Sequence, residues 1–347
     1  MGFKIFKKFG FVLDVVLMAV FLYASANTTL VIYGMDQARG QWNILRQVKP
    51  IEDVLSDAGT PDTIKAKLRL IAVIKKFAIE ECGLKETENY STYYDQQGKP
   101  LLWVLTASER YALKAMEWKF PLLGDVSYKG FFNYPKGKNE EQALKQVGYD
   151  TDFDEVSAWS TLGWFRDPVL SGMLKRDVGS LAELIIHEMT HGTIYLKSSV
   201  NFNENFANLV GEEGAARFLA STYGSDSPEM KKYLARKHDI DLYSRYMIAS
   251  AARLDSLYRS MTGMTSDWEK EKKKTSMMNS IVNGTDTLHF NDPARFGKLF
   301  SHGLPNNTWF LSFRRYDEQK DSLKAELNTK FQGNLKAYIA FVVAQNE

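Results

Sequence analysis

The chain is poor in cysteine and histidine: among 347 residues, one is cysteine and five are histidine. A single cysteine excludes a disulfide framework and a zinc cluster built from thiolates. Cys82 lies in "IEECGL", at the end of a helical pattern, as a packed thiol would. The formal net charge is only +2, so no excess of either sign indicates nucleic acid, and we expect no nucleic-acid partner.

Low-complexity linkers and internal repeats are also missing, and 44% of the residues are hydrophobic, which is ample for a core. Helical patterns occupy "PIEDVL" and the stretch after Pro61, where Leu68, Ile71, Ile74 and Ala78 recur at helical spacing. Three short apolar runs predict a small sheet, at 103–106, 126–132 and 156–163. After Ser180 the pattern is almost entirely helical, with helices expected from Pro228, Asn307 and Asn334. The sequence therefore predicts an α+β fold.

The N-terminus combines positive charge with an apolar run. Lys4, Lys7 and Lys8 precede "FVLDVVLMAVFLYASANTTLVIYG", and positive residues mark the cytoplasmic side of such a segment. Residues 1–34 are therefore either a signal peptide cleaved near "ASA" or an uncleaved membrane anchor, while a buried soluble helix is the alternative. Both favoured interpretations place residues 35–347 outside the cytoplasm, in the periplasm or on the periplasmic face of the membrane.

Two of the five histidines stand four residues apart in "LAELIIHEMTH". Ser180 and Glu183 form a capping-box pattern, which predicts a helix from there to about Tyr195. His187 and His191 then lie one turn apart on the same helix face, where both imidazoles can reach one metal ion. This is the HExxH pattern, and neutral imidazoles suit Zn²⁺.

A catalytic zinc usually has a third protein ligand. Glu204 in "NFNENFANL" is the candidate, because Asn203 is a good N-cap and the next helix can fold back so that Glu204 faces the histidines. Glu188 is rotated by about 100° from His187, which suits a base acting on a metal-bound water rather than a ligand. The alternative is two core histidines with a surface Glu188.

"HEMTH" followed by "NENFA" resembles the zinc-binding pair of gluzincin metallopeptidases. From about Tyr33 the chain is similar to a bacterial family called putative aminopeptidases, often lipoproteins; the landmarks include "DQARGQW", "AWSTLGWFRDPVLSGML", "FNENFANLVGEEGA" and "LPNNTWFLSFRRY". The resemblance implies a zincin-like fold with the zinc between two parts, about 35–197 and 198–347. Where relatives often carry a lipid-attachment cysteine, this chain has Asn27.

The resemblance also suggests roles for flanking residues. Ser160–Gly163 would be a sheet edge that pairs with substrate, or else an ordinary structural strand. A tyrosine from a later helix often donates to the oxyanion in this clan, and Tyr316 is the first candidate, followed by Tyr246. An aminopeptidase also needs a carboxylate for the substrate's amine, for which Asp167, Glu212 or Glu213 are open candidates.

The function expected from these features is zinc-dependent peptide hydrolysis, of aminopeptidase type, with Glu188 as the general base. Peptides or proteins would be the substrates, and the N-terminal segment would contact the membrane. Three alternatives remain open: an endopeptidase of the same fold, a metal-binding regulatory or assembly protein without peptidase activity, and a membrane-tethered interaction protein without metal.

Overall fold

The computed structural model describes residues 27–120, 124–156, 166–297, 299–301 and 303–346. The chain divides into two compact units, residues 1–47 and 48–347. In the first unit, helix α2 (Thr28–Leu45) is described. The predicted boundary between the signal or anchor segment (1–34) and the domain (35–347) falls inside this helix. The domain division itself stays a prediction. Most of the N-terminal apolar run lies outside the described residues. Among the described residues, no helix is long and apolar enough to cross a membrane.

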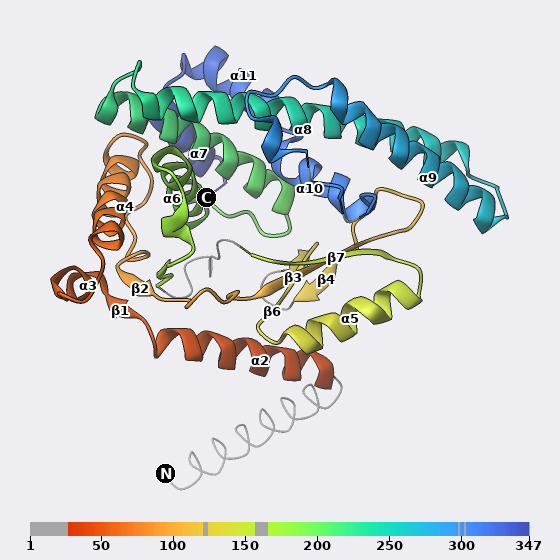
Figure 1. Cartoon of the computed structure of the whole chain (residues 1–347), viewed down its shortest axis with the longest axis horizontal. Helices are drawn as coiled ribbons and strands as arrows, with labels where there is room; N and C mark the ends of the chain where they lie inside the picture. Colours follow the sequence, from red (N-terminus) through yellow and green to blue (C-terminus); the bar gives the residue numbers. More distant parts are fainter. Residues whose placement is uncertain (1–26, 121–123, 157–165, 298, 302, 347) are drawn as a thin grey trace, which may run out of the picture. The chain divides into compact units, whose positions relative to one another are not determined.

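The second unit is mostly helical (Figure 1). Its α-helices are α3 (Ile51–Ser56), α4 (Asp62–Glu80), α5 (Tyr134–Gln146), α6 (Val178–Thr193), α7 (Val200–Tyr223), α8 (Pro228–Ser260), α9 (Asp267–Gly284), α10 (Asn307–Asp317), α11 (Lys320–Phe331) and α12 (Leu335–Ala344). Figure 1 shows α6 to α11 gathered on one side of this unit, with β3, β6, β7 and α5 on the other. The α+β prediction is confirmed.

Three small sheets accompany these helices. The first has the order β1 (Lys49–Pro50), β2 (Thr92–Tyr94), β8 (Val169–Leu170), with β2 and β8 parallel. The second is antiparallel, with the order β6 (Lys129–Phe131), β3 (Trp103–Ser108), β7 (Asp150–Glu155). The third is the hairpin of β4 (Trp118–Phe120) and β5 (Gly124–Val126).

The core around the predicted metal helix is built from three helices. The predicted stripe of α4, Leu68, Ile71, Ile74 and Ala78, is fully buried, and α4 packs against α6. On its other side α6 packs along α7. Leu181, Ile185 and Ile186 are likewise buried. The helix that carries the histidines is therefore held from two sides by apolar contacts.

The structure corrects two sequence predictions. The strand expected over 126–132 is instead two strands, β5 and β6, which belong to different sheets and are separated at residues 127–128. The sequence predicts two helices at the C-terminus, which are α10 and α12, but α11 lies between them. Helix α11 buries only a narrow stripe, which includes Leu323 and Leu327, so its hydrophobic periodicity in the sequence is weak. The strand expected over 156–163 lies almost wholly outside the described residues.

Candidate metal centre

Helix α6 begins earlier than the capping box predicted. Its N-cap is Asp177, whose side chain accepts a hydrogen bond of 2.8 Å from the backbone amide of Ser180. Asp177 therefore does what Ser180 was expected to do, because an aspartate side chain caps at least as well as a serine. Glu183 does not reach back to the cap but pairs with Arg236 on α8, at 2.7 Å. The spacing of His187 and His191 is unaffected by this shift.

Helix α7 also begins earlier than predicted, at Val200, so Glu204 lies in its second turn rather than its first. Asn203 is not the N-cap. Its amide accepts from the backbone nitrogen of Leu196 at 2.9 Å and donates to the Leu196 carbonyl at 2.8 Å. These two bonds fix the connection between α6 and α7. The antiparallel return that brings Glu204 to the histidines is as predicted.

A face of small residues lets α7 approach α6 closely. Ala207, Gly211 and Ala215 are spaced four residues apart, and both alanines are fully buried. A Cβ at Gly211 would lie 2.9 Å from the carbonyl oxygen of Glu183 and 3.2 Å from the Cβ of His187. Contacts this short leave no room for a side chain. Gly211 therefore allows the helix of Glu204 to reach the helix of His187.

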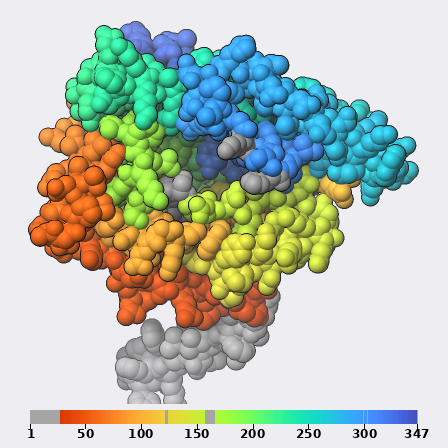
Figure 2. Space-filling model, in the orientation of Figure 1, coloured from red at the N-terminus to blue at the C-terminus, as the bar shows by residue number. Residues whose placement is uncertain are grey.

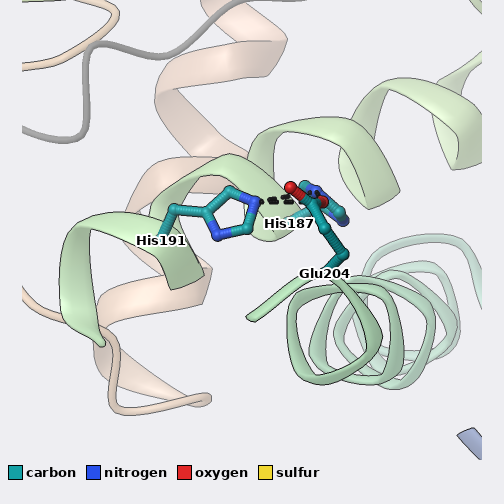
Figure 3. Close-up of side chains that lie close together, drawn as sticks. All are labelled: His187, His191 and Glu204. Carbon is teal, nitrogen blue, oxygen red and sulfur yellow. Dashed lines mark hydrogen bonds and ion pairs between the residues drawn. The ribbon is translucent and has the colours of Figure 1, made fainter. Parts of the chain in front are cut away.

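The three predicted ligands converge between α6 and α7 (Figure 3). The Nε2 atoms of His187 and His191 are 3.1 Å apart. One oxygen of Glu204 lies 3.4 Å from the first and 3.5 Å from the second. Ligands bound to zinc at roughly 2.0–2.1 Å in a tetrahedron are separated by about 3.3 Å. The three donor atoms thus form a triangle of the size that a tetrahedral zinc requires.

The electrostatics of the cluster favour a cation. Burial favours the protonated carboxyl of Glu204, but hydrogen bonds from His187 and His191 outweigh it and hold its pKa well below the ordinary value. Burial likewise favours the neutral imidazole of His187, yet the contact with Glu204 and the charges of Glu188 and Glu183 raise its pKa. The carboxylate thus keeps its charge, and the site attracts positive charge.

One ring nitrogen in the cluster has no visible partner. The Nδ1 atom of His191 is buried, and no described residue forms a hydrogen bond with it. With Nε2 directed at a metal, Nδ1 would carry the proton and usually donate it to a carbonyl or carboxylate. Nothing in the described residues explains why the Nδ1 atom of His191 lacks such an acceptor.

The proposed catalytic side chains lie beside the ligands. Glu188 is half-buried on α6, and its charge contributes to the raised pKa of His187 and of the Tyr316 phenol. Burial is the largest cause of the raised pKa of Tyr316, followed by the charge of Glu204, although 36% of the residue is exposed. The phenol of Tyr316 is therefore protonated at neutral pH and able to donate. Its backbone carbonyl is held by the Asn208 side chain at 2.8 Å.

Sequence reasoning missed three residues near the ligands. Tyr128 follows β5, and burial together with the charge of Glu204 raises its pKa. Tyr90 is 3% exposed, has a φ of 62°, and its hydroxyl has no hydrogen-bond partner among the described residues; burial and then the charge of Glu188 raise its pKa. Arg315 directly precedes Tyr316 and is 8% exposed. The "RRY" sequence held the signal for Arg315, but an arginine is ordinarily expected at the surface.

The other tyrosine considered for the oxyanion has a structural role. The hydroxyl of Tyr246 donates to the carbonyl of Ile281 at 2.7 Å, which ties α8 to α9. The substrate edge expected at Ser160–Gly163 lies outside the described residues.

The three carboxylates considered for the substrate's amine are all engaged by the protein. Asp167 is fully buried and accepts a hydrogen bond from the Asn89 side chain at 3.3 Å. Glu212 pairs with Lys237 at 2.5 Å and with Lys320 at 2.9 Å. Glu213 contacts the cations of two residues, Arg217 and Lys324. The geometry therefore favours none of the three as an amine-binding group.

The cluster is mostly enclosed. The side chains of His187, His191 and Glu204 are 14%, 6% and 13% exposed. In the space-filling view, the surface of the second unit is hollowed between the lime-coloured α6 and the blue C-terminal part of the chain (Figure 2). A separate cavity of about 610 Å³, lined by residues that include Thr63, contains none of the three ligands. The metal cluster and that cavity are therefore different places.

The fold and the cluster define an α+β chain with an HExxH helix and a glutamate from the following helix, a set of donors that could hold a metal ion. A family model described as "Putative aminopeptidase" matches residues 32–346. The chain belongs to this family, as the resemblance in its sequence indicated. No curated protein and no solved structure matches the chain.

Proposed function

We propose that the protein is a zinc-dependent peptidase that acts outside the cytoplasm. The observation that supports this most directly is the triangle of His187, His191 and Glu204 donor atoms, with edges of 3.1, 3.4 and 3.5 Å, on an HExxH helix. His187, His191 and Glu204 would hold the zinc as its three protein ligands, the number usual in catalytic zinc sites. When bound, zinc lowers the pKa of water and polarises a peptide carbonyl.

The residues around the cluster supply the remaining chemistry. Glu188 takes a proton from the attacking water and passes it to the leaving amine, since it neighbours a ligand without being one. Tyr316 donates from its phenol to the oxygen that becomes negative at the carbonyl carbon. The charges of Glu204 and Glu188, which contribute to the raised pKa of Tyr316, support this role because the phenol must lie near both carboxylates.

The family description supports an activity of the aminopeptidase type. Since Asp167, Glu212 and Glu213 are engaged elsewhere, the free amine of a substrate would be held by another group, and an endopeptidase of the same fold remains the second candidate. The location is proposed from the N-terminal lysines and the apolar run after them, which are typical of export.

The test separates metal binding from catalysis. Purified protein should contain about one zinc per chain, and His187→Ala or His191→Ala should remove it. Glu188→Gln should keep the zinc, because no ligand is lost, while peptide hydrolysis falls by about 10²–10⁴. Glu204→Gln should lose both, because an amide is a poor zinc ligand.

Several results would contradict the proposal. Full zinc occupancy in both histidine variants would refute the ligand assignment. Hydrolysis at the wild-type rate by zinc-bound Glu188→Gln would refute the mechanism. A wild-type protein that binds zinc but cleaves no member of a peptide library would instead favour a regulatory or assembly role.

A further inference from the structure

Arg315 is a buried cation without a counter-charge. It is 8% exposed, and no carboxylate of the described residues lies within 4.0 Å of its guanidinium. Its Nε has no hydrogen-bond partner among those residues, and its Nη2 is 3.5 Å from the carbonyl oxygen of Ser127, at the limit of a hydrogen bond. A desolvated charge in this state is unfavourable unless a partner arrives.

The other buried cations of the second unit show what is missing. The cations Lys129, Lys237, Lys274 and Lys320 are each buried, and each has a carboxylate oxygen within 2.7 Å. The chain thus pairs these buried charges within the protein. Arg315 departs from that pattern, which indicates that its partner is supplied from outside.

Arg315 is connected to the cluster of His187, His191 and Glu204 through neighbouring residues. Its guanidinium is 5.8 Å from the centre of the Tyr128 ring, and its positive charge lowers the pKa of the neighbouring Tyr316 phenol. Its backbone carbonyl accepts a 2.6 Å hydrogen bond from Asn205, the residue that follows the ligand Glu204. The charge of Glu204 contributes to the raised pKa of both phenols next to Arg315, those of Tyr128 and Tyr316.

We propose that Arg315 binds a carboxylate of the substrate next to the bond that is cleaved. This inference rests on the proposed peptidase function and adds the class of substrate: peptides with a negative charge close to the scissile bond. A guanidinium presents a planar pair of donors that matches a carboxylate. Two parts of a peptide carry this group, the C-terminal carboxylate of a short peptide and the side chain of an acidic residue.

Four peptides of one sequence distinguish the two sources. They combine a free or an amidated C-terminus with glutamate or glutamine beside the scissile bond. With zinc-loaded wild type, Arg315→Gln and Arg315→Lys, we would measure kcat and KM for each peptide. Arg314→Gln is the matched control, because Arg314 is on the same helix but is already paired with Asp255. Thermal melts check that each variant folds.

We expect Arg315→Gln to lower kcat/KM by roughly 10- to 100-fold, mainly through KM, for the peptides that carry the recognised carboxylate. The peptide with neither carboxylate should change by less than about threefold, which is small beside the loss of a charged hydrogen bond. Arg315→Lys should lose less kcat/KM than Arg315→Gln, because the positive charge remains. If Arg315→Gln does not fold, Arg315→Lys is measured in its place. Whichever carboxylate shows the effect is the source.

An equal loss of kcat on all four peptides would show that Arg315 acts through Tyr316, and would overturn the proposal. No loss on any peptide would overturn it as well. If the wild type cleaves none of the four, the peptidase proposal fails for them, and calorimetric binding to the zinc-loaded protein decides the role of Arg315. The proposal is supported if the wild type binds a carboxylate peptide more tightly than the neutral one and Arg315→Gln abolishes this difference. Equal binding of the two peptides by the wild type would overturn the proposal.

Discussion

Replacing Gly211 tests whether the close approach of α7 to α6 builds the metal cluster. In Gly211→Ala the new Cβ would meet the carbonyl oxygen of Glu183 at 2.9 Å and the Cβ of His187 at 3.2 Å. The first contact involves backbone, so it cannot be relieved by rotating a side chain. The helices must separate by a few tenths of an ångström, and the donor atoms of His187 and Glu204 must separate with them.

Two effects set the size of the change in stability. Overpacking of this kind costs typically about 1–3 kcal/mol, while alanine is better than glycine inside a helix by up to about 1 kcal/mol. The free energy of unfolding of zinc-free Gly211→Ala should therefore fall by up to about 2 kcal/mol, measured by urea denaturation. Zinc affinity, measured by competition with a chelator, should fall roughly 10- to 100-fold, as it does when the support of a ligand is disturbed.

Two other glycines are matched controls for this experiment. A Cβ at Gly214 would meet Ile186 Cγ2 at 2.9 Å and Cδ1 at 3.0 Å, which are side-chain atoms of a residue outside the cluster rather than backbone. A Cβ at Gly192, one residue after His191, would meet nothing within 4 Å. Gly214→Ala should lose less zinc affinity than Gly211→Ala, and Gly192→Ala should lose none. Wild-type zinc affinity and stability in Gly211→Ala, or a larger loss in Gly214→Ala, would refute the argument.

Three further predictions concern stability, the thiol and location. Glu212→Ala leaves Lys237 and Lys320 without this buried carboxylate, and should lower the free energy of unfolding by about 3 kcal/mol, measured in urea; an unchanged value would contradict the pairing. Burial raises the pKa of the Cys82 thiol to about 12, so the thiolate fraction at pH 8 is about one in ten thousand, and a thiol reagent should modify it only after unfolding. A reporter enzyme that functions only after export, fused to the C-terminus of the full chain, should be active. If only a reporter that functions in the cytoplasm is active in the same position, export is contradicted.

The part of the site that follows helical periodicity could be predicted from the sequence. His187 and His191 had to share a face because they are four residues apart, and the short connection placed Glu204 opposite them. The exact helix starts could not be predicted, since Asp177 and Ser180 are both good caps and tertiary contacts decide between them. The substrate edge at 160–163 stays a prediction.

Strand β3 contains the run predicted at 103–106, but strand β7 and the unpaired arginine lay beyond sequence reasoning. Strand β7, "DTDFDE", is strongly acidic and shows no apolar run, yet it pairs with β3 along its length and buries Thr151. Such a strand is defined by its partner rather than by its own composition. Arg315 likewise looks like a surface residue until the fold encloses it. Burial of a charge depends on which elements pack over it, and one sequence does not contain that information in a local pattern.

Two asparagines of α7, Asn205 and Asn208, fix the position of Tyr316 relative to Glu204. Asn205 donates to the carbonyl of Arg315 at 2.6 Å and accepts from the amide of Gln319 at 2.8 Å, and Asn208 donates to the carbonyl of Tyr316 at 2.8 Å. Asn205 can do both because an amide side chain is donor and acceptor at once. The helix that carries Glu204 thus also fixes the backbone at the C-terminal end of α10, so the distance from the cluster of His187, His191 and Glu204 to Tyr316 depends on these hydrogen bonds.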